Sequence, residues 1–250
     1  ITPAGEDKKL QTALKRSKRE INMHQNKKTM LKEMESAKFF AQDDLESLLD
    51  KNGHLLGFKN GVFDLETGTF RAGTPGEYVS KTTEYEFQHN TDGQFNEKMQ
   101  YLDNTLNGCF LDTDTSSWFK KHLGSFLHWG NPEEYFYVWI GDGRNGKGLW
   151  DQLLRDAIGK QFYKDLGKET VVRKKLGSSG PEPNVTKLKF ARAVVIHELA
   201  SSDVIEVDVV KRFRGGDKIS ARGLYKLEED EFVMKGKTVF QTNHDLKTTD

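Results

Sequence analysis

The stretch YFYVWIGDGRNGKGLW, residues 135–150, constrains the fold of this chain more than any other. A six-residue apolar run leads into a glycine-rich turn, and a run compatible with a helix follows it. Gly141, Gly146 and Lys147 match the spacing G-x-x-x-x-G-K of a phosphate-binding loop, in which backbone N–H groups and a helix N-terminus converge on phosphate. This order of strand, glycine loop and helix predicts an α/β fold with a nucleotide site.

The loop departs from the usual pattern at its last position, where Gly148 replaces a Ser or Thr. The missing hydroxyl removes one Mg²⁺ ligand, but Mg²⁺ keeps several waters in nucleotide sites, and a water can take that place. We therefore expect ATP binding, with Lys147 on the β- and γ-phosphates and with weaker or altered Mg²⁺ binding. The alternative is a glycine-rich turn without a ligand. The candidate nucleotide-binding residues are Gly141, Asp142, Gly143, Arg144, Asn145, Gly146, Lys147 and Gly148.

Two later apolar runs carry further candidates for the same site. AVVIHEL places Glu198 near the end of a strand, where an acid can polarise the attacking water and lie near the metal. Many P-loop enzymes carry two acids at this point, but here the neighbour is His197. KTVFQTN ends in Asn243, whose amide can hold the water or sense the γ-phosphate. The plainer interpretations are a surface acid for Glu198 and a turn or cap residue for Asn243.

Composition excludes some functions and leaves others open. Lys and Arg together number 38, as do Asp and Glu, so net charge gives no argument for nucleic acid, which must rest on local patches. The single cysteine excludes a disulfide framework and suits a reducing compartment. Since no apolar run approaches the roughly 20 residues needed to span a bilayer, we expect a soluble intracellular protein without membrane contact.

The rest of the chain suggests three regions. Residues 1–50 are predicted to be helical, because the stretch from position 8 to position 50 lacks Gly and Pro. The first half of this stretch is strongly basic, and it is either a solvated helix face or a surface for nucleic acid or a neighbouring subunit. Residues 51–130 are predicted to hold short strands joined by KNG and ETG turns, then two helices broken near Asn107-Gly108. Residues 131–250 alternate strand, loop, helix, strand and strand, as expected of an α/β P-loop domain.

Several of these stretches together resemble a known family. LGFKNGVFDLETG, GDGRNGKG, ARAVVIHEL and VVKRFRGGDKISARGLY followed by VFQTN are similar, in order and spacing, to the superfamily 3 helicases, specifically the poxvirus-type primase-helicases of large DNA viruses, phages and mobile elements. The resemblance covers residue 50 to the end. It implies an AAA+-type ATPase core that ends here after the sensor 1 strand. It also implies a ring, usually hexameric, that uses ATP and Mg²⁺ to translocate on single-stranded DNA and unwind duplex during replication.

Carried over by position, the resemblance makes Lys147, Glu198 and Asn243 the catalytic residues, with Glu198 near the metal. It also implies a pore hairpin between Glu198 and Asn243, for which the DNA-binding candidates are Lys218, Arg222 and Lys226. Cations in a narrow channel track phosphates without reading sequence, although each could instead be a solvated surface charge. A primase or polymerase domain is an expected partner, and the cytoplasm of a host cell is the expected location.

The family's arginine finger normally follows the sensor, whereas this sequence stops at Asp250. Such a finger is worth about 10³–10⁵ in rate, so we expect the chain alone to bind nucleotide and hydrolyse it poorly. Two other functions stay open. One is a different P-loop enzyme such as a nucleotide kinase, which DNA-stimulated ATPase activity would exclude. The other is an ATP-binding, ring-forming DNA scaffold or loader without strong ATPase activity, which binding without turnover would favour.

Overall fold

The computed structural model describes residues 11–19, 24–36, 45–89, 94–172, 183–214, 216–221 and 230–249. The chain divides into two units, residues 1–48 and 49–250. The described part of the first unit is helical, with a helix over residues 11–19, α2 (His24–Ser36) and α3 (Leu45–Leu48). All side chains of residues 11–19 are exposed, so the basic residues of this helix face solvent.

The second unit begins with a small antiparallel sheet of order β1-β2-β3. Its strands are β1 (Leu55–Phe58), β2 (Gly61–Asp64) and β3 (Thr69–Arg71). The two connections fall at the predicted KNG and ETG turns, and in the second turn Asp64 accepts hydrogen bonds from the backbone N–H groups of Glu66 and Thr67. After β3, the 3₁₀ turn η1 (Pro75–Glu77) is tied back to the strand by an ion pair between Arg71 and Glu77.

Two helices follow, α4 (Gln94–Cys109) and α5 (Thr113–Ser125), and they contact each other. The predicted break near Asn107-Gly108 is wrong by a few residues, because α4 continues through Gly108 and the chain turns at residues 110–112. Asp112 sets the start of α5, since its carboxylate accepts a hydrogen bond of 2.7 Å from the backbone N–H of Thr115. N-cap carboxylates stabilise a helix end by satisfying a backbone donor that has no partner within the helix.

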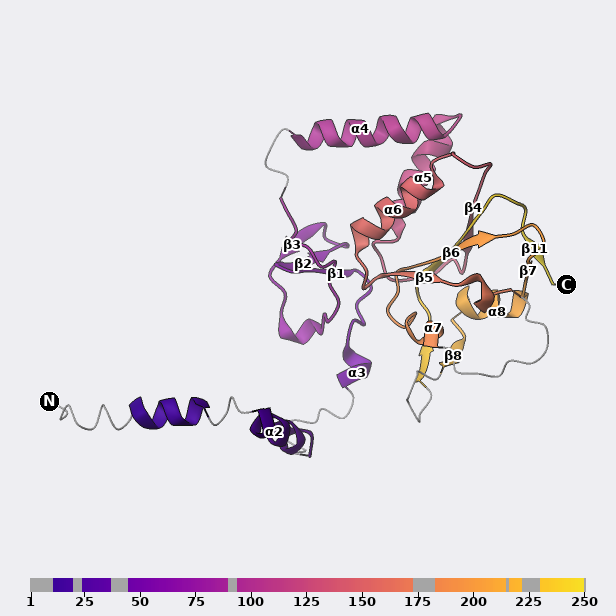
Figure 1. Ribbon diagram of the computed structural model, residues 1–250. Helices are drawn as coiled ribbons and strands as arrows, with labels where there is room; N and C mark the ends of the chain where they lie inside the picture. The colour runs from indigo at the N-terminus through magenta and orange to yellow at the C-terminus, as the bar shows by residue number, and fades with distance from the viewer. Residues whose placement is uncertain are drawn as a thin grey trace. The chain divides into compact units, whose positions relative to one another are not determined.

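A four-stranded parallel sheet of order β4-β10-β6-β5 forms the centre of the second unit (Figure 1). Its strands are β4 (Phe136–Ile140), β5 (Tyr163–Leu166), β6 (Ala193–Leu199) and β10 (Lys237–Thr242). The central strands β6 and β10 are covered on both faces, which is why they are continuous apolar runs in the sequence. The predicted mixed α/β fold is confirmed, but β5 was not predicted, because only its first and last residues are buried.

Alternate residues of the sheet enter two hydrophobic clusters. Trp139, Val195 and Val239 pack with side chains of α4, α5 and α6 (Lys147–Ile158). Val194, Ile196 and Phe240 pack on the opposite face with α7 (Pro183–Thr186), α8 (Val207–Arg214) and the strands β8 (Lys218–Ala221) and β9 (Asp230–Val233). Figure 1 shows α4, α5 and α6 on one side of the strands and α7, α8 and β8 on the other.

Short elements complete the second unit. The 3₁₀ turn η2 (Lys168–Thr170) follows β5, and β7 (Val204–Ile205) pairs in parallel with β11 (Lys247–Thr248). In the stretch VIEVDVVKRF, the first two residues form β7, and α8 begins only at Val207. Strands β8 and β9 pair antiparallel, as expected of a hairpin.

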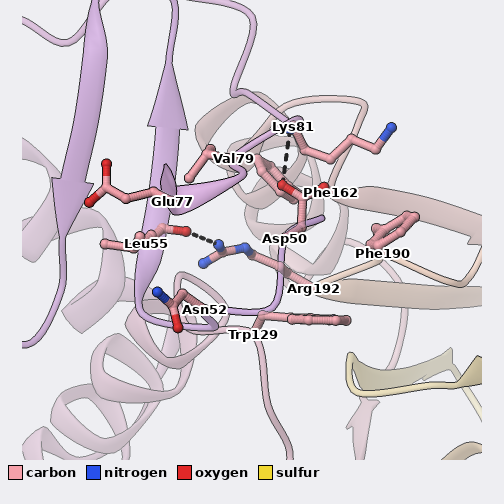
Figure 2. A pocket seen from close by; sticks show the side chains of 10 residues that line it. All are labelled: Asp50, Asn52, Leu55, Glu77, Val79, Lys81, Trp129, Phe162, Phe190 and Arg192. Atoms are coloured by element: carbon pink, nitrogen blue, oxygen red, sulfur yellow. Dashed lines mark hydrogen bonds between the residues drawn. The ribbon is translucent and has the colours of Figure 1, made fainter. Parts of the chain in front are cut away.

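Two buried cations hold the amino ends of the central strands in place. Arg192, next to β6, donates a 2.6 Å hydrogen bond to the carbonyl of Leu55 in the small sheet, and its guanidinium lies 4.7 Å from the ring centroid of Phe162 (Figure 2). Burial lowers the pKa of Arg192 to about 10, so it stays charged at neutral pH. Lys237, at the start of β10, donates to the carbonyls of Ser125 and Gly130.

Candidate functional site

The glycine-rich loop joins the end of β4 to the start of α6, and two of its glycines lie where a side chain would meet a neighbour or a backbone restriction. A Cβ added at Gly141 would lie 1.9 Å from the side-chain nitrogen of Asn145. Gly146 directly precedes α6 with φ of 86°, in the left-handed region that L side chains rarely adopt. Arg144 also has positive φ, at 66°. The loop is therefore a tight turn into a helix N-terminus, where backbone N–H groups are available to an anion.

Lys147 is the first residue of α6, and its ammonium group folds back over the loop. It donates hydrogen bonds to the carbonyl of Gly141 and, over 3.0 Å, to the side-chain oxygen of Asn145. Asn145 thus braces the loop through this contact with Lys147. Gly148 is exposed, and a Cβ built on it would have no atom within 4 Å. The position that lacks the usual hydroxyl is therefore open space beside the lysine.

A β-bulge deforms β6 at the residues that follow its apolar run. Phe240 of β10 pairs with Ile196, and Thr242 pairs with Leu199, so two residues of β6, His197 and Glu198, lie opposite one residue of β10. Glu198 has φ of 59°, an unusual and strained conformation for a residue with a side chain. Bulges and strained residues of this kind concentrate beside functional sites, where they redirect a side chain.

The three candidate catalytic residues line one cavity. Lys147 from α6, Glu198 from the end of β6 and Asn243 just after β10 line a cavity of about 370 Å³ at the carboxyl ends of the parallel strands. The strand order places β10 between β4 and β6, so Asn243 leaves the sheet between the glycine loop and Glu198. Motifs separated by about 50 residues in the sequence therefore converge on one space.

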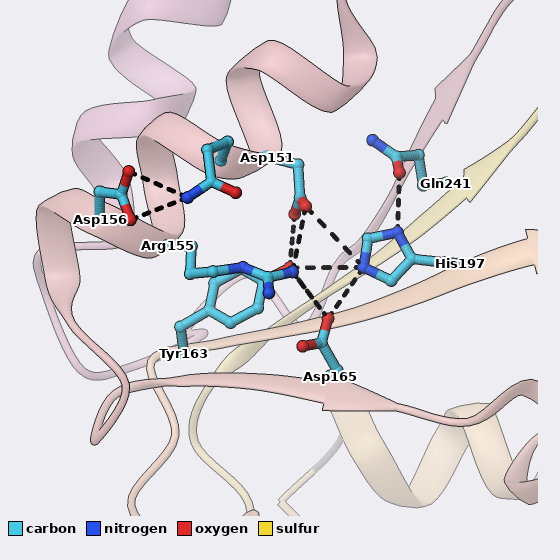
Figure 3. Close-up of polar contacts among 8 residues, drawn as sticks. Asp151, Arg155, Asp156, Tyr163, Asp165, His197 and Gln241 are labelled. Carbon is cyan, nitrogen blue, oxygen red and sulfur yellow. Dashed lines mark hydrogen bonds and ion pairs between the residues drawn. The ribbon is translucent and has the colours of Figure 1, made fainter.

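His197, which lines this cavity, connects three neighbouring strands (Figure 3). Its Nδ1 lies 2.7 Å from the side-chain oxygen of Gln241 in β10, and its Nε2 lies 3.0 Å from a carboxylate oxygen of Asp165 in β5. The ring is therefore held from both sides. His197 stands where a second acid is common, and its neighbour Asp165 supplies a carboxylate from the adjacent strand instead.

The network continues onto the helix that follows the glycine loop. Asp151 is buried, and it accepts a hydrogen bond from the hydroxyl of Tyr163. Arg155 donates to Asp165 over 3.2 Å and lies 3.5 Å from Asp151. Burial, together with the hydrogen bond to Asp151, raises the pKa of the Tyr163 phenol, so this hydroxyl remains a donor at neutral pH. The network links α6 to the sheet, and two of its members, His197 and Gln241, also line the cavity.

Sequence reasoning missed five residues of this network, Asp151, Arg155, Tyr163, Asp165 and Gln241. Asp151 could have been found, since it follows Lys147 by four positions and therefore lies on the same face of α6, and Arg155 follows Asp151 by four more. The positions of Tyr163, Asp165 and Gln241 depend on the register of β5, β6 and β10, which the sequence does not reveal.

Of the candidate DNA-binding residues, Lys218 lies within the described part of the chain, on the β8–β9 hairpin. Lys218 begins β8, is exposed, and lies 3.2 Å from a carboxylate oxygen of Glu231 on β9. Ile219 and Phe232 are buried and anchor the hairpin to the core. The other two candidates, at positions 222 and 226, lie outside the described residues.

The residues around the cavity are chemically suited to Mg²⁺. Glu198 offers a carboxylate and Asn243 an amide oxygen, both hard oxygen donors of the kind that Mg²⁺ takes alongside water and phosphate. Among the described residues, ligand atoms of His54, Asp64 and Glu66 also lie within 4.8 Å of one another, on the small sheet. Asp64 already accepts two backbone hydrogen bonds there, which gives this cluster a structural role in the turn.

Residues 2–159 match the family described as D5 N terminal like, which is more than half of the chain. The chain therefore belongs to the D5 N-terminal-like family. The predicted resemblance to viral primase-helicases is confirmed at this level.

Relatives in large DNA viruses carry helicase and primase names. The chain is 36% identical over 178 residues to "Putative helicase L207/L206" of Acanthamoeba polyphaga mimivirus, covering 71% of this chain and 18% of that protein. It is 32% identical to "Putative helicase 121R" of Invertebrate iridescent virus 3, over 77% of this chain and 20% of that protein. "Putative primase C962R" of African swine fever virus is 26% identical, over 97% of this chain and 25% of its own length. The chain thus spans about a fifth to a quarter of these relatives.

Among solved structures, the apo C-terminal region of NrS-1 aligns with a TM-score of 0.45 and 16% sequence identity, over 58% of this chain and 34% of that one. Within the part of the chain that the structure describes, each helix is too short or too polar to cross a membrane.

Proposed function

We propose that this chain is the ATPase core of a replicative DNA helicase of superfamily 3. The observation that carries the proposal is the convergence of Lys147, Glu198 and Asn243 on one cavity at the carboxyl edge of a parallel sheet, beside a glycine-rich loop. Ligands of open α/β sheets bind at the carboxyl ends of the strands, where loops and helix N-termini meet. The helicase and primase names of the viral relatives support the same function.

The proposal gives each residue of the cavity a role. The loop backbone, the N-terminus of α6 and Lys147 hold the phosphates of ATP, which replace Gly141 and Asn145 as partners of the ammonium group. Glu198 activates the attacking water, and Asn243 holds that water or contacts the γ-phosphate. Mg²⁺, when bound, neutralises phosphate charge and orients the oxygens around the transferred group. His197 keeps the bulged end of β6 fixed between its two neighbouring strands.

Binding of DNA is assigned to the hairpin between Glu198 and Asn243. Lys218, with the candidates at positions 222 and 226, contacts phosphates of single-stranded DNA in the pore of a ring, usually a hexamer. ATP turnover drives translocation, and a primase or polymerase domain works with the motor. The exposed position of Lys218 on β8 supports this assignment.

Two residues, Gly148 and His197, favour a second candidate function. Gly148 has no hydroxyl for the metal, and His197 is engaged by Asp165 and Gln241 where an acid is common. A nucleotide-binding DNA scaffold or loader, whose ATP site binds without turnover, would have these features. The kinase alternative has no such support in the described residues.

Equilibrium binding of ATP tests the proposal. Replacing Lys147 by Ala removes the only side-chain cation that lines the cavity among the described residues, apart from the imidazoles of His197 and His244. We expect ATP affinity to fall at least tenfold, since hydrogen bonds to charged groups contribute about 1.5–3 kcal/mol. Lys160→Ala, at an exposed lysine just after α6, is the matched control and should bind as the unaltered chain does. Equal affinity in all three proteins would exclude this cavity as the ATP site.

A further inference from the structure

A second hollow, of about 310 Å³, adjoins the first at Lys147, which lines both. It lies between α5, β4 and α6, and it shares Asn145 and Lys147 with the glycine loop. Its size falls at the lower end of the range for small-molecule pockets, about 300–1,000 Å³. Most of its lining is aromatic, and the aromatic residues are Phe110, Trp118, Phe119, Tyr137, Trp139 and Trp150.

Trp118 is the most accessible of these rings, with 55% of its surface exposed. It stacks on His122, with ring centroids 5.1 Å apart and planes 8° from parallel. His122 is itself fixed, because its Nε2 accepts a 3.2 Å hydrogen bond from the indole nitrogen of Trp139. Burial lowers the pKa of His122 to about 4, so the stacked ring is neutral at pH 7. The structure thus holds an exposed indole in a preset orientation at the edge of the hollow.

Trp150 supplies a donor that lacks a partner. It lies one turn into α6 and is only 3% exposed, and its indole N–H finds no hydrogen-bond acceptor among the described residues. The indole nitrogen faces the loop, since a Cβ placed on Gly146 would lie 3.4 Å from it. Buried donors are nearly always paired, so this unpaired N–H beside the glycine loop is available to an oxygen of a bound ligand.

We propose that this hollow binds the nucleoside of the nucleotide, with the base stacked on Trp118 and the indole N–H of Trp150 donating to an oxygen of the sugar–phosphate chain. The inference rests on the proposed function, because it takes Lys147 as the phosphate partner. Lys147 lines both spaces, so phosphates at its ammonium group extend toward Glu198 and Asn243 on one side. The nucleoside then occupies the aromatic side.

The test compares a ligand that has a base with one that has only phosphates. Binding of ADP and of inorganic tripolyphosphate is measured for the unaltered chain, Trp118→Ala and Trp118→Phe. Base–aromatic stacking is typically strong enough that its loss weakens binding about tenfold or more. We expect Trp118→Ala to weaken ADP binding by that factor and leave tripolyphosphate binding unchanged, and Trp118→Phe to retain most of the ADP affinity. Circular dichroism confirms that the variants fold.

Tyr101→Ala is the matched control, since Tyr101 is an aromatic residue on α4 that is 75% exposed and does not line the hollow. It should bind both ligands normally. Unchanged ADP affinity in Trp118→Ala, together with loss of both ligands in Lys147→Ala, would overturn the nucleoside site and leave the proposed function standing. Equal weakening of both ligands by Trp118→Ala would also overturn it, because the effect would then act through the loop. Failure of the unaltered chain to bind either ligand would overturn both proposals.

Discussion

The two ends of the parallel sheet are built from the same strands, but their charged residues are buried at one end and line an open cavity at the other. At the amino end, Arg192 and Lys237 are each only 4% exposed, and they donate to backbone carbonyls from other parts of the chain. At the carboxyl end, Lys147, Glu198 and Asn243 line an open cavity. Glu198 also has a left-handed backbone conformation there.

This difference separates residues that hold the fold from residues available for chemistry. If a buried cation is removed, the carbonyl oxygens that it satisfied stay buried without a hydrogen-bond donor, which costs folding free energy. The ammonium group of Lys147 contacts the loop itself, so it can exchange those partners for phosphate oxygens. Changes at the amino end should therefore alter stability, and changes at the carboxyl end should alter activity.

The largest effect is expected from Glu198→Gln, which keeps the shape of the side chain and removes its ability to accept a proton. General-base catalysis typically contributes about 10²–10⁴ in rate, so turnover of ATP should fall by at least 100-fold. ATP affinity should change little, because Lys147 and the loop remain. Phosphate release in single-turnover experiments measures the first quantity, and equilibrium titration measures the second.

Glu134→Gln provides the control for this change. Glu134 is also an exposed glutamate with positive φ, at 52°, but it lies outside the cavity. It should leave turnover unchanged. Similar losses in both variants would show that the carboxylate of Glu198 has no special role.

Lys237→Met tests the opposite end of the sheet. It removes donors from the carbonyls of Ser125 and Gly130, and each lost bond to a charged donor costs about 1.5–3 kcal/mol. We expect the free energy of unfolding to fall by about 3 kcal/mol, as measured by urea denaturation, with ATP affinity unchanged. Lys235→Met, at an exposed lysine two positions earlier, should cost less than about 1 kcal/mol. Equal stability of the two variants would contradict the structural role of Lys237 at the amino end of the sheet.

Acid should lower the free energy of unfolding through protonation of the buried His122. Its pKa is about 4 in the folded chain and 6.5 in an unfolded one, mainly because of burial and also because of the charge on Lys237. Between these values the unfolded chain binds more protons, so this stabilisation is complete above about pH 6.5 and is lost as pH falls toward 4. The contribution lost between pH 7 and pH 5 is about 2 kcal/mol.

His122→Gln keeps a hydrogen-bond acceptor for Trp139 and removes the titration. Urea denaturation at pH 7 and pH 5 should therefore show a smaller loss of stability in the variant than in the unaltered chain. Identical pH dependence of the two proteins would contradict the assignment to His122.

The smallest expected effect is a gain, from Gly148→Ser. The position is exposed and has room for a side chain, so the hydroxyl that phosphate loops usually carry can be added without a clash. Half-maximal ATP turnover should then require severalfold less Mg²⁺, and the helix should gain about 0.5 kcal/mol from the loss of glycine. A Mg²⁺ titration of ATP turnover checks the first effect, and an unchanged requirement would mean that Gly148 does not face the metal.

The sequence predicts the parts of the fold that local pattern determines. β4, β6 and β10 are apolar runs, and the glycine loop has a characteristic spacing, so all four were predicted at the right places. β5 was missed because Lys164 and Asp165 interrupt its two buried residues. The start of α5 was misplaced because Asn107-Gly108 resembles a helix break, whereas the cap at Asp112 determines the start.

The candidate site, like the fold, can be predicted from the sequence only in part. Lys147, Glu198 and Asn243 follow from motifs and their order along the chain. The bulge at Glu198 and the network around His197 depend on how β6 pairs with β5 and β10, and pairing register is a property of the assembled sheet.

Hydrolysis of ATP with and without single-stranded DNA, by the unaltered chain and by Lys147→Ala, tests the central claim most directly. The account predicts that DNA raises turnover in the unaltered chain and that Lys147→Ala abolishes both the basal and the stimulated rate. Turnover that is insensitive to DNA, or that survives in Lys147→Ala, would contradict the assignment of this cavity to a DNA motor.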